Sequence, residues 1–447
     1  MSLELNTIRR RELLLGSLVL AGSQAAKCAG LPAARNVIRS VRELEEACRA
    51  GGHYTLLPGT YVLDDKVLRP VSGTRITGIR GRTVLRKQTS PGPYRTRAFF
   101  DIEDAKNIII EGIEFRHLSN RFEMGVIVRA TSRGSAGHIT VRDCVFSRCY
   151  VYIQRYVDTV AVQNNKFLLD GVVGGVGVGG EINKFNGKGL NLDGVVNNVR
   201  ISDNYFERAR TEAIDLNWNV QNVTIERNYC YNCNTDKINE VIDVGGDVKT
   251  TVSNQCRNIV ITNNKIVNDM PGAMSTIGIH VKGRSTNVRV ENNLIVRTGS
   301  MGGVGIRVWN ADDTIIRGNT ISGYDYGIAT TDATQNLPQR CSILSNIIRN
   351  YRVDGVELRG AYFMVASNEI EGTGSTGSSI DIVNLTRSVI HDNKMRNSAA
   401  SGIRTQTPSS DLRITSNRVY KPAGGHGYQL AAPRSIIERN TVEIVRQ

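Results

Sequence analysis

One pattern recurs in two stretches of the chain: Val199-Arg-Ile-Ser-Asp-Asn204-Tyr-Phe206 and Val223-Thr-Ile-Glu-Arg-Asn228-Tyr-Cys230. Alternating apolar residues lead into two polar residues, an asparagine, and an apolar residue two positions later. The asparagine of this pattern recurs as Asn165, Asn204, Asn228, Asn264, Asn293, Asn319, Asn346, Asn368, Asn393, Asn417 and Asn440. Successive asparagines are 22 to 29 residues apart, apart from two longer steps that begin at Asn165 and Asn228. A period in this range indicates a solenoid in which each repeat forms one coil.

The repeated asparagines predict a column of hydrogen-bonded amides. An asparagine side chain both donates and accepts hydrogen bonds, and it tolerates tight turns. If each repeat is one coil, the amides stack from coil to coil and satisfy buried turn positions without charge. Two earlier repeats carry Gly112 and Cys144 in the asparagine position. We therefore expect the asparagine column to start at Asn165.

Residues 40–50 predict a short amphipathic helix, with Ser40 as its N-cap and Glu43 three residues later as the partner in a capping box. The sequence Leu57-Pro-Gly-Thr-Tyr61 follows shortly afterwards. A helix followed by such a sequence resembles the start of the extracellular right-handed parallel β-helices of the pectin-lyase-like superfamily. The resemblance implies an all-β chain: one right-handed parallel β-helix solenoid of about thirteen coils over residues 53–447. Residues 26–52 would form an N-terminal segment with a capping helix, which covers the core and strand edges of the first coil.

The N-terminal residues predict export. Adjacent arginines from Arg9 to Arg11 precede a short apolar run and a small-x-small sequence, Ser23-Gln-Ala25. This arrangement resembles a twin-arginine signal peptide, which we place at residues 1–25. The apolar run is too short to span a membrane, and Lys27 before Cys28 argues against a lipid-anchored cysteine. We expect a periplasmic or secreted protein without a membrane anchor.

The charge of the chain indicates a polyanionic partner. The formal net charge is +14, which favours an acidic polysaccharide or a nucleic acid. No nucleic-acid-binding motif is present and aromatic residues make up only 6% of the chain, so we expect an acidic polysaccharide and no nucleic acid. The Cys230-Tyr-Asn-Cys233 pair has no second pair to complete a zinc site. The sequence leaves the disulfide pattern and the oligomeric state open.

A second column of residues carries the chemistry. Each repeat contains a glycine or small residue, an apolar residue, a variable residue X and another apolar residue, and period-two alternation points X toward solvent. The X residues of the central coils are Asn191, Asp215, Asp243, His280 and Arg307. The next outward positions hold Asp193, Asn217, Gly245, Lys282 and Trp309. Neighbouring coils lie about 4.8 Å apart, so we expect these residues to form one stripe, with Glu240, Lys249 and Arg284 nearby.

This stripe suits removal of the C5 proton of a uronic acid. That reaction needs a base and a cation that neutralises the adjacent carboxylate. His280 and Lys282 are the candidate bases, and Arg307 or Arg284 is the candidate carboxylate-binding cation. Asp215 and Asp243 are candidate ligands of a Ca²⁺ that would serve the same purpose. The predicted activity is β-elimination or C5 epimerisation, and we expect Asn191, Asp193, Asn217, Arg284, Trp309 and Lys249 to bind the substrate.

Two other functions remain open at this stage. The order of Asn191-Leu-Asp193-Gly194, Asp215, Gly278-Ile-His280 and Arg307-Val-Trp309 is similar to the successive motifs of polygalacturonases. That resemblance implies a glycoside hydrolase with carboxylates as acid and base. His280 and Arg307, one coil apart, also resemble the bacterial alginate C5-epimerases. A polysaccharide-binding surface protein without catalysis is the third possibility, since unlike charges on adjacent strands can simply pair.

Overall fold

The computed structural model describes residues 36–87, 98–118, 124–171, 174–179, 194–236, 240–246, 255–270, 276–299, 302–331, 337–373, 377–406, 409–421 and 426–444. The predicted signal peptide at residues 1–25 lies outside this part of the chain. So do three predicted substrate-binding residues, Asn191, Asp193 and Lys249.

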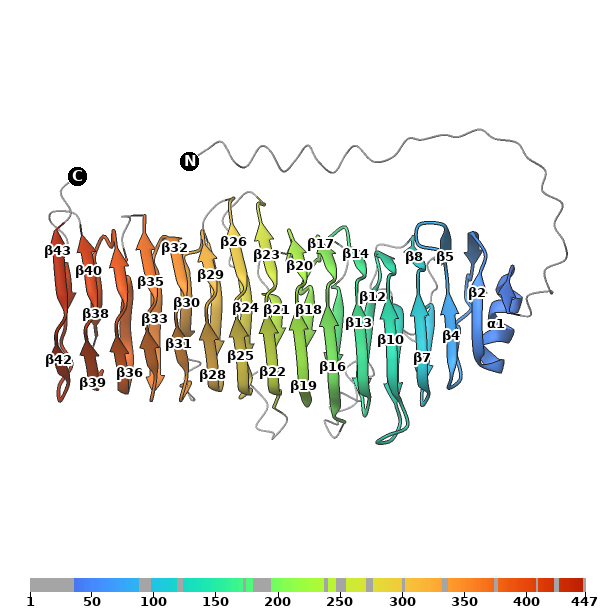
Figure 1. Cartoon of the computed structure of the whole chain (residues 1–447), viewed down its shortest axis with the longest axis horizontal. Helices are drawn as coiled ribbons and strands as arrows, with labels where there is room; N and C mark the ends of the chain where they lie inside the picture. The colour runs from blue at the N-terminus through green and yellow to red at the C-terminus, as the bar shows by residue number, and fades with distance from the viewer. Residues whose placement is uncertain are drawn as a thin grey trace, which may run out of the picture. The chain divides into compact units, whose positions relative to one another are not determined.

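Residues from Val37 onward form a solenoid of parallel β-strands with about 13 turns. Figure 1 shows the strands of successive coils side by side. The predicted all-β fold is therefore confirmed. In the described residues the strands form two hydrogen-bonded sheets of 28 and 15 strands. The larger sheet covers two faces of the solenoid, because the long strand β36 (Ile380–His391) pairs with strands of both.

We name the three faces the site face, the middle face and the third face. The site face contains β6 (Phe100–Glu103), β9 (Met124–Ala130), β12 (Tyr150–Arg155), β15 (Val176–Gly179), β18 (Ile214–Leu216), β21 (Glu240–Val244), β24 (Ile277–Lys282), β27 (Val304–Trp309), β30 (Tyr326–Thr331), β33 (Asp354–Ala361), the start of β36, β38 (Ser401–Thr405) and β41 (His426–Gln429).

The middle face contains β1 (Val37–Ile38), β2 (Gly52–Leu56), β4 (Thr74–Thr77), β7 (Lys106–Glu111), β10 (Gly137–Arg142), β13 (Asp158–Gln163), β16 (Val196–Ser202), β19 (Val220–Glu226), β22 (Arg257–Thr262), β25 (Thr286–Glu291), β28 (Asp312–Arg317), β31 (Ser342–Leu344), β34 (Met364–Ala366), the end of β36, β39 (Ser410–Thr415) and β42 (Ile436–Glu438).

The third face contains β3 (Gly59–Val62), β5 (Thr83–Lys87), β8 (Glu114–His117), β11 (Val145–Ser147), β14 (Lys166–Leu168), β17 (Tyr205–Glu207), β20 (Tyr229–Tyr231), β23 (Lys265–Asn268), β26 (Leu294–Arg297), β29 (Thr320–Ser322), β32 (Ile347–Tyr351), β35 (Glu369–Gly372), β37 (Lys394–Arg396), β40 (Arg418–Lys421) and β43 (Thr441–Ile444).

The asparagine column lies at the corner between the middle face and the third face. From Asn165 to Asn440, the Nδ2 of each asparagine donates to the Oδ1 of the next one at 2.9–3.0 Å. The residue before each asparagine has a left-handed backbone, with φ from 52° to 65°, which turns the chain between the two strands. The predicted ladder is confirmed, and Cys144 holds the position before Asn165 as expected, since its backbone N–H donates to Asn165 Oδ1. The prediction for Gly112 is wrong by one residue: Glu114 pairs with Val145, so Ile113 holds that position, and Gly112 is the left-handed residue before it, with φ of 70°.

One row of the core is built from the inward positions two residues after this corner. Phe115, Phe146, Phe167 and Phe206 stack in succession with ring centroids 4.7–4.8 Å apart. In the following coils smaller apolar residues continue the row in register, beginning with Cys230. The seven described cysteines are all free and buried. Stacked side chains of like shape hold the coils in register.

The N-terminal helix α1 (Val41–Ala50) covers the start of the solenoid, as predicted. Ser40 Oγ accepts the backbone N–H of Glu43 at 3.2 Å. The Glu43 carboxylate accepts from the backbone N–H of Arg39 rather than of Ser40, so the capping box is displaced by one residue. No helix within the described part of the chain is long and apolar enough to span a membrane.

Candidate active site

The strands of the site face place most of the predicted stripe in one row. Backbone pairing aligns Asp215 with Asp243, Asp243 with His280, and His280 with Arg307. Lys282 is aligned with Trp309 in the same way. Asp215 and Arg307, 92 positions apart in the sequence, therefore lie in one row that crosses four consecutive coils.

One predicted member of the row is wrong. Between Tyr152 and Asp215 the register position is held by Gly177 of β15, whereas the pattern predicted Asn191. Asn191 and Asp193 lie outside the described residues. A Cβ at Gly177 would lie 2.9 Å from the Tyr152 ring, so glycine lets that ring lie over β15.

The expectation that the X residues face solvent is also wrong at the centre of the row. Only 4% of Asp243 and 1% of His280 is exposed. Their side chains leave the sheet on its outer side, yet neighbouring side chains cover them. The indole of Trp309 stacks on the His280 imidazole, with centroids 5.9 Å apart and planes 4° apart. Burial in this position makes each charge costly unless it is paired.

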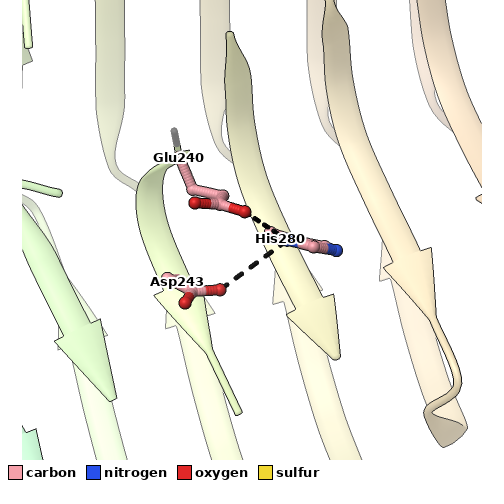
Figure 2. Close-up of side chains that lie close together, drawn as sticks. All are labelled: Glu240, Asp243 and His280. Atoms are coloured by element: carbon pink, nitrogen blue, oxygen red, sulfur yellow. Dashed lines mark hydrogen bonds and ion pairs between the residues drawn. The ribbon is translucent and has the colours of Figure 1, made fainter. Parts of the chain in front are cut away.

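Glu240 and His280 form a close polar pair at the centre of the site. His280 Nδ1 lies 2.7 Å from Glu240 Oε1, and Figure 2 shows the other ring nitrogen pointing away from the carboxylates. Burial favours the neutral form of Glu240, but the hydrogen bond from His280 and the charges of His280 and Lys282 outweigh it and lower the pKa of Glu240 to about 2. Because an ionised carboxylate only accepts, Nδ1 carries the proton and Nε2 carries a lone pair.

His280 is neutral at physiological pH. Burial lowers its pKa to about 4, even though the Glu240 carboxylate opposes this shift. Its Nε2 atom is buried and has no hydrogen-bond partner among the described residues. The Nε1 of Trp309 is in the same situation. A buried basic nitrogen without a protein partner is a feature of sites that receive a ligand.

Asp243 is paired with Lys282. Lys282 Nζ lies 2.8 Å from Asp243 Oδ2 and 3.7 Å from Glu240 Oε1. Burial raises the pKa of Asp243, and the Lys282 ammonium opposes that rise. Burial also works against the charge on Lys282, but the carboxylates of Asp243 and Glu240 raise its pKa above its usual value. Lys282 is therefore a cation at neutral pH, which does not fit the predicted role of a base.

The residues present do not fit the predicted Ca²⁺ between Asp215 and Asp243. The Lys282 ammonium already holds one oxygen of Asp243, and Asn217 Nδ2 donates to Asp215 Oδ2 at 2.6 Å. The ligand atoms of Glu240, Asp243 and His280 lie within 4.8 Å of one another. A metal ion there would face the ammonium at close range, and like charges in a buried site repel strongly. We conclude that Lys282 supplies the positive charge itself.

Arg307 supplies a second positive charge beside His280. Its guanidinium carbon lies 5.4 Å from the centroid of the Trp309 ring, a distance at which a cation interacts with an aromatic face. Burial lowers the pKa of Arg307, but an arginine remains protonated in proteins. Arg284 is different, because it lies in the exposed turn after β24, with φ of 61°.

Glu240 is the candidate site residue to which the sequence assigned no role. The sequence placed it only near the site, and the structure shows that it begins β21, outside the alternation that marks Asp243. Its backbone pairs with Ile277, yet its side chain reaches His280. The available signal was an acidic residue three positions before a stripe residue, next to a long insertion in the repeat.

A sequence model described as a right-handed β-helix region matches residues 96–321 and 304–444. The chain belongs to this right-handed β-helix family. The match confirms the predicted handedness and the fold of the resemblance. No curated protein matches the sequence.

Several solved structures resemble this right-handed β-helix. The A-module of mannuronan C-5 epimerase AlgE4 of Azotobacter vinelandii has 14% identity and a TM-score of 0.39, over 91% of this chain and 96% of that one. The periplasmic alginate epimerase AlgG has 12% identity and a TM-score of 0.41, over 88% of this chain and 77% of that one. PfbA, a surface adhesin of Streptococcus pneumoniae, has 11% identity and a TM-score of 0.47, over 90% of this chain and 89% of that one. These likenesses are too distant to bear on chemistry, which has to be argued from the site.

Proposed function

We propose that this protein is an exported enzyme that acts on an acidic polysaccharide by removing the C5 proton of a uronic acid. The outcome is β-elimination or C5 epimerisation. The observation that carries the proposal is the buried Glu240–His280 pair, with two cations near the neutral imidazole: Lys282 two residues further along β24, and Arg307 in the paired position of β27. The net charge of +14 supports a polyanionic substrate.

In this proposal His280 is the base. Its Nδ1–H is held by Glu240, so the Nε2 lone pair accepts the C5 proton. Burial keeps the imidazole unprotonated before the reaction. The Glu240 carboxylate then stabilises the imidazolium that forms, as a second carboxylate does for other histidine bases.

Arg307 and Lys282 are proposed to bind the carboxylate of the uronic acid. Neutralising that group lowers the pKa of the adjacent C5–H and stabilises the negative charge that develops when the proton leaves. In β-elimination the electron pair forms the C4–C5 double bond, and the C4–O bond breaks with protonation of the departing oxygen. In epimerisation a proton returns to C5 from the opposite face.

Trp309 controls access to His280. The indole lies parallel to the imidazole, and only 1% of His280 is exposed, so a side chain has to move before C5 reaches Nε2, and we assign this movement to the indole. The same indole can then pack against the apolar face of the sugar, and its N–H can donate to a sugar oxygen. A substrate hydroxyl can thereby satisfy the buried Nε1 donor.

Hydrolysis is the second candidate, and one observation favours it. Burial raises the pKa of Asp243 while that of Glu240 is lowered to about 2. Two carboxyl groups with separated pKa values suit a glycosidase acid and its base or nucleophile. The ammonium at 2.8 Å from Asp243 favours ionised Asp243, and so favours proton abstraction over hydrolysis.

Product analysis on polyuronates separates these functions. The proposal predicts an unsaturated sugar end, seen as ultraviolet absorbance, or inverted C5 configuration without cleavage. New reducing ends without absorbance would show hydrolysis instead. Binding without any chemical change on the whole panel of acidic polymers would show a non-catalytic polysaccharide-binding protein.

A further inference from the structure

The third face carries a compact aromatic and basic surface away from the site face. Backbone pairing aligns Lys166, Tyr205, Tyr229 and Lys265 in one column on strands β14, β17, β20 and β23. Tyr231 lies two residues after Tyr229 on the same side of β20. On each of these four strands, the residue directly after the column residue is buried in the core. We call these five residues the tyrosine–lysine patch.

The side chains of the patch contact one another. Lys166 Nζ lies 5.4 Å from the centroid of Tyr205, and Lys265 Nζ lies 4.7 Å from that of Tyr229. The rings of Tyr205 and Tyr229 are 5.5 Å apart and edge to face. Tyr229 and Tyr231 are 6.2 Å apart. A positive charge therefore accompanies the aromatic surface at both ends of the column.

Hydrogen bonds and the core hold the patch in place. The Tyr205 hydroxyl donates to Glu207 at 3.1 Å, and the Tyr231 hydroxyl donates to Asp269 at 2.8 Å. The asparagine ladder runs through the same coils, with one asparagine directly before each residue of the column. A surface that is already ordered loses little entropy when it binds a ligand.

We propose that the tyrosine–lysine patch is a second binding site for a chain of acidic polysaccharide. The apolar face of a sugar ring packs on a tyrosine ring, and an ammonium group pairs with a sugar carboxylate. The column follows the solenoid axis with steps of about 4.8 Å, so an extended polymer can contact several of its residues at once. The ligand class rests on the proposed function, whereas the location of the site does not.

Binding to the polymer and turnover of short substrates test this separately. The test variant is the double substitution Tyr205→Ala and Tyr229→Ala. We expect its retardation in gels containing polygalacturonate or alginate to fall at least about fivefold in apparent affinity. Turnover of short oligouronates is expected to stay unchanged, because the site face is intact. The matched double substitution to Phe keeps the rings and should keep the binding.

Tyr362→Ala is the control outside the patch. Tyr362 is 47% exposed and has the Arg387 guanidinium carbon 5.7 Å from its ring centroid, so it offers the same chemistry without the column. We expect the control to bind as the wild type does.

Each other outcome decides the matter. Unchanged retardation of the double Ala variant overturns the inference, and so does a parallel loss of oligouronate turnover. Loss of self-association with unchanged retardation also overturns it, because the patch would then bind a second copy of the chain. If the wild-type protein turns over no oligouronate but its retardation depends on the patch, the inference stands and the proposed function fails.

Discussion

In our proposal His280 is the base, and its pKa is lowered by burial and raised by the Glu240 carboxylate. Since its pKa is about 4, we expect kcat/KM to fall as the pH drops through about 4. Glu240 raises that pKa, so Glu240→Gln should move the acidic limb of the profile to lower pH and also reduce turnover. The measurement is a pH–rate profile on a polyuronate. Glu291→Gln removes a buried carboxylate on the middle face and should leave the profile unchanged.

The same two residues predict how stability depends on pH. The pKa of His280 is lower in the folded chain than its usual 6.5, so its contribution is complete above pH 6.5 and is lost as the pH falls toward 4. The contribution of Glu240, whose pKa falls from 4.5 to about 2, is lost between those values. These two groups make the denaturant midpoint decline below pH 6.5, against the opposite effect of Asp354 and Asp243, whose pKa values burial raises. His280→Ala should flatten the decline between pH 6.5 and 4, and an equally steep decline in that variant would contradict the account.

The ion pairs of Lys282 predict that catalytic activity does not depend on a divalent metal ion. Because its ammonium binds the carboxylates of Asp243 and Glu240, we expect activity to survive exhaustive treatment with a chelator. Lys282→Ala should lower activity strongly, and added Ca²⁺ should not restore it. A chelator-sensitive wild-type enzyme that regains activity with Ca²⁺ would show that the site is a metal site after all.

At the scale of elements, the asparagine ladder makes a stability prediction. Asn293 Nδ2 donates to Ile261 O and to Asn319 Oδ1, while its Oδ1 accepts from Asn264. Asn293→Ala leaves several buried groups unpaired at about 1–3 kcal/mol each, so we expect a loss of about 3 kcal/mol or more. Denaturant unfolding measures it. Asn440→Ala at the partly exposed end of the ladder is the control and should cost clearly less.

The sequence predicted the elements whose pattern is local and repeated. The asparagine frame identified the coils, and Ser40 with Glu43 identified the helix. The row residue in the long step after Asn165 was predicted wrongly, because Val176-Gly-Val178 and Leu190-Asn-Leu192 alternate equally well. Only the pairing of β15 with its neighbours places Gly177 in the row. Where the step between two asparagines is long, the repeat period alone does not decide which of two candidate segments forms the strand.

Only part of the site was predicted, because the repeat pattern gives the register of the strands but not the contacts of their side chains. Register along the ladder placed Asp215, Asp243, His280 and Arg307 in one row. Alternation predicts on which side of the strand a side chain lies, but not which other side chains cover that side chain. The stacking of Trp309 on His280 depends on side-chain directions on two coils, as does the reach of Glu240. Burial, and with it the pKa of each group, could therefore not be predicted.

At the scale of the whole molecule, our proposals assign a polymer to two surfaces of the solenoid, each with its own task. In our proposal the site face carries the chemistry, and the third face carries the tyrosine–lysine patch. The formal charge of +14 is consistent with a polyanionic substrate. The twin-arginine signal predicted at residues 1–25 lies outside the described residues and stays a prediction, testable by following the protein to the periplasm or medium.

The most direct test of the central claim is a reaction with polyuronates in heavy water, comparing the wild-type protein with His280→Ala. Proton abstraction predicts either deuterium at C5 or an unsaturated C4–C5 end in the wild-type reaction, with a rate about 10²–10⁴-fold lower in the variant. New reducing ends with neither deuterium at C5 nor unsaturation would contradict the account, and so would a His280→Ala variant that reacts as fast as the wild type.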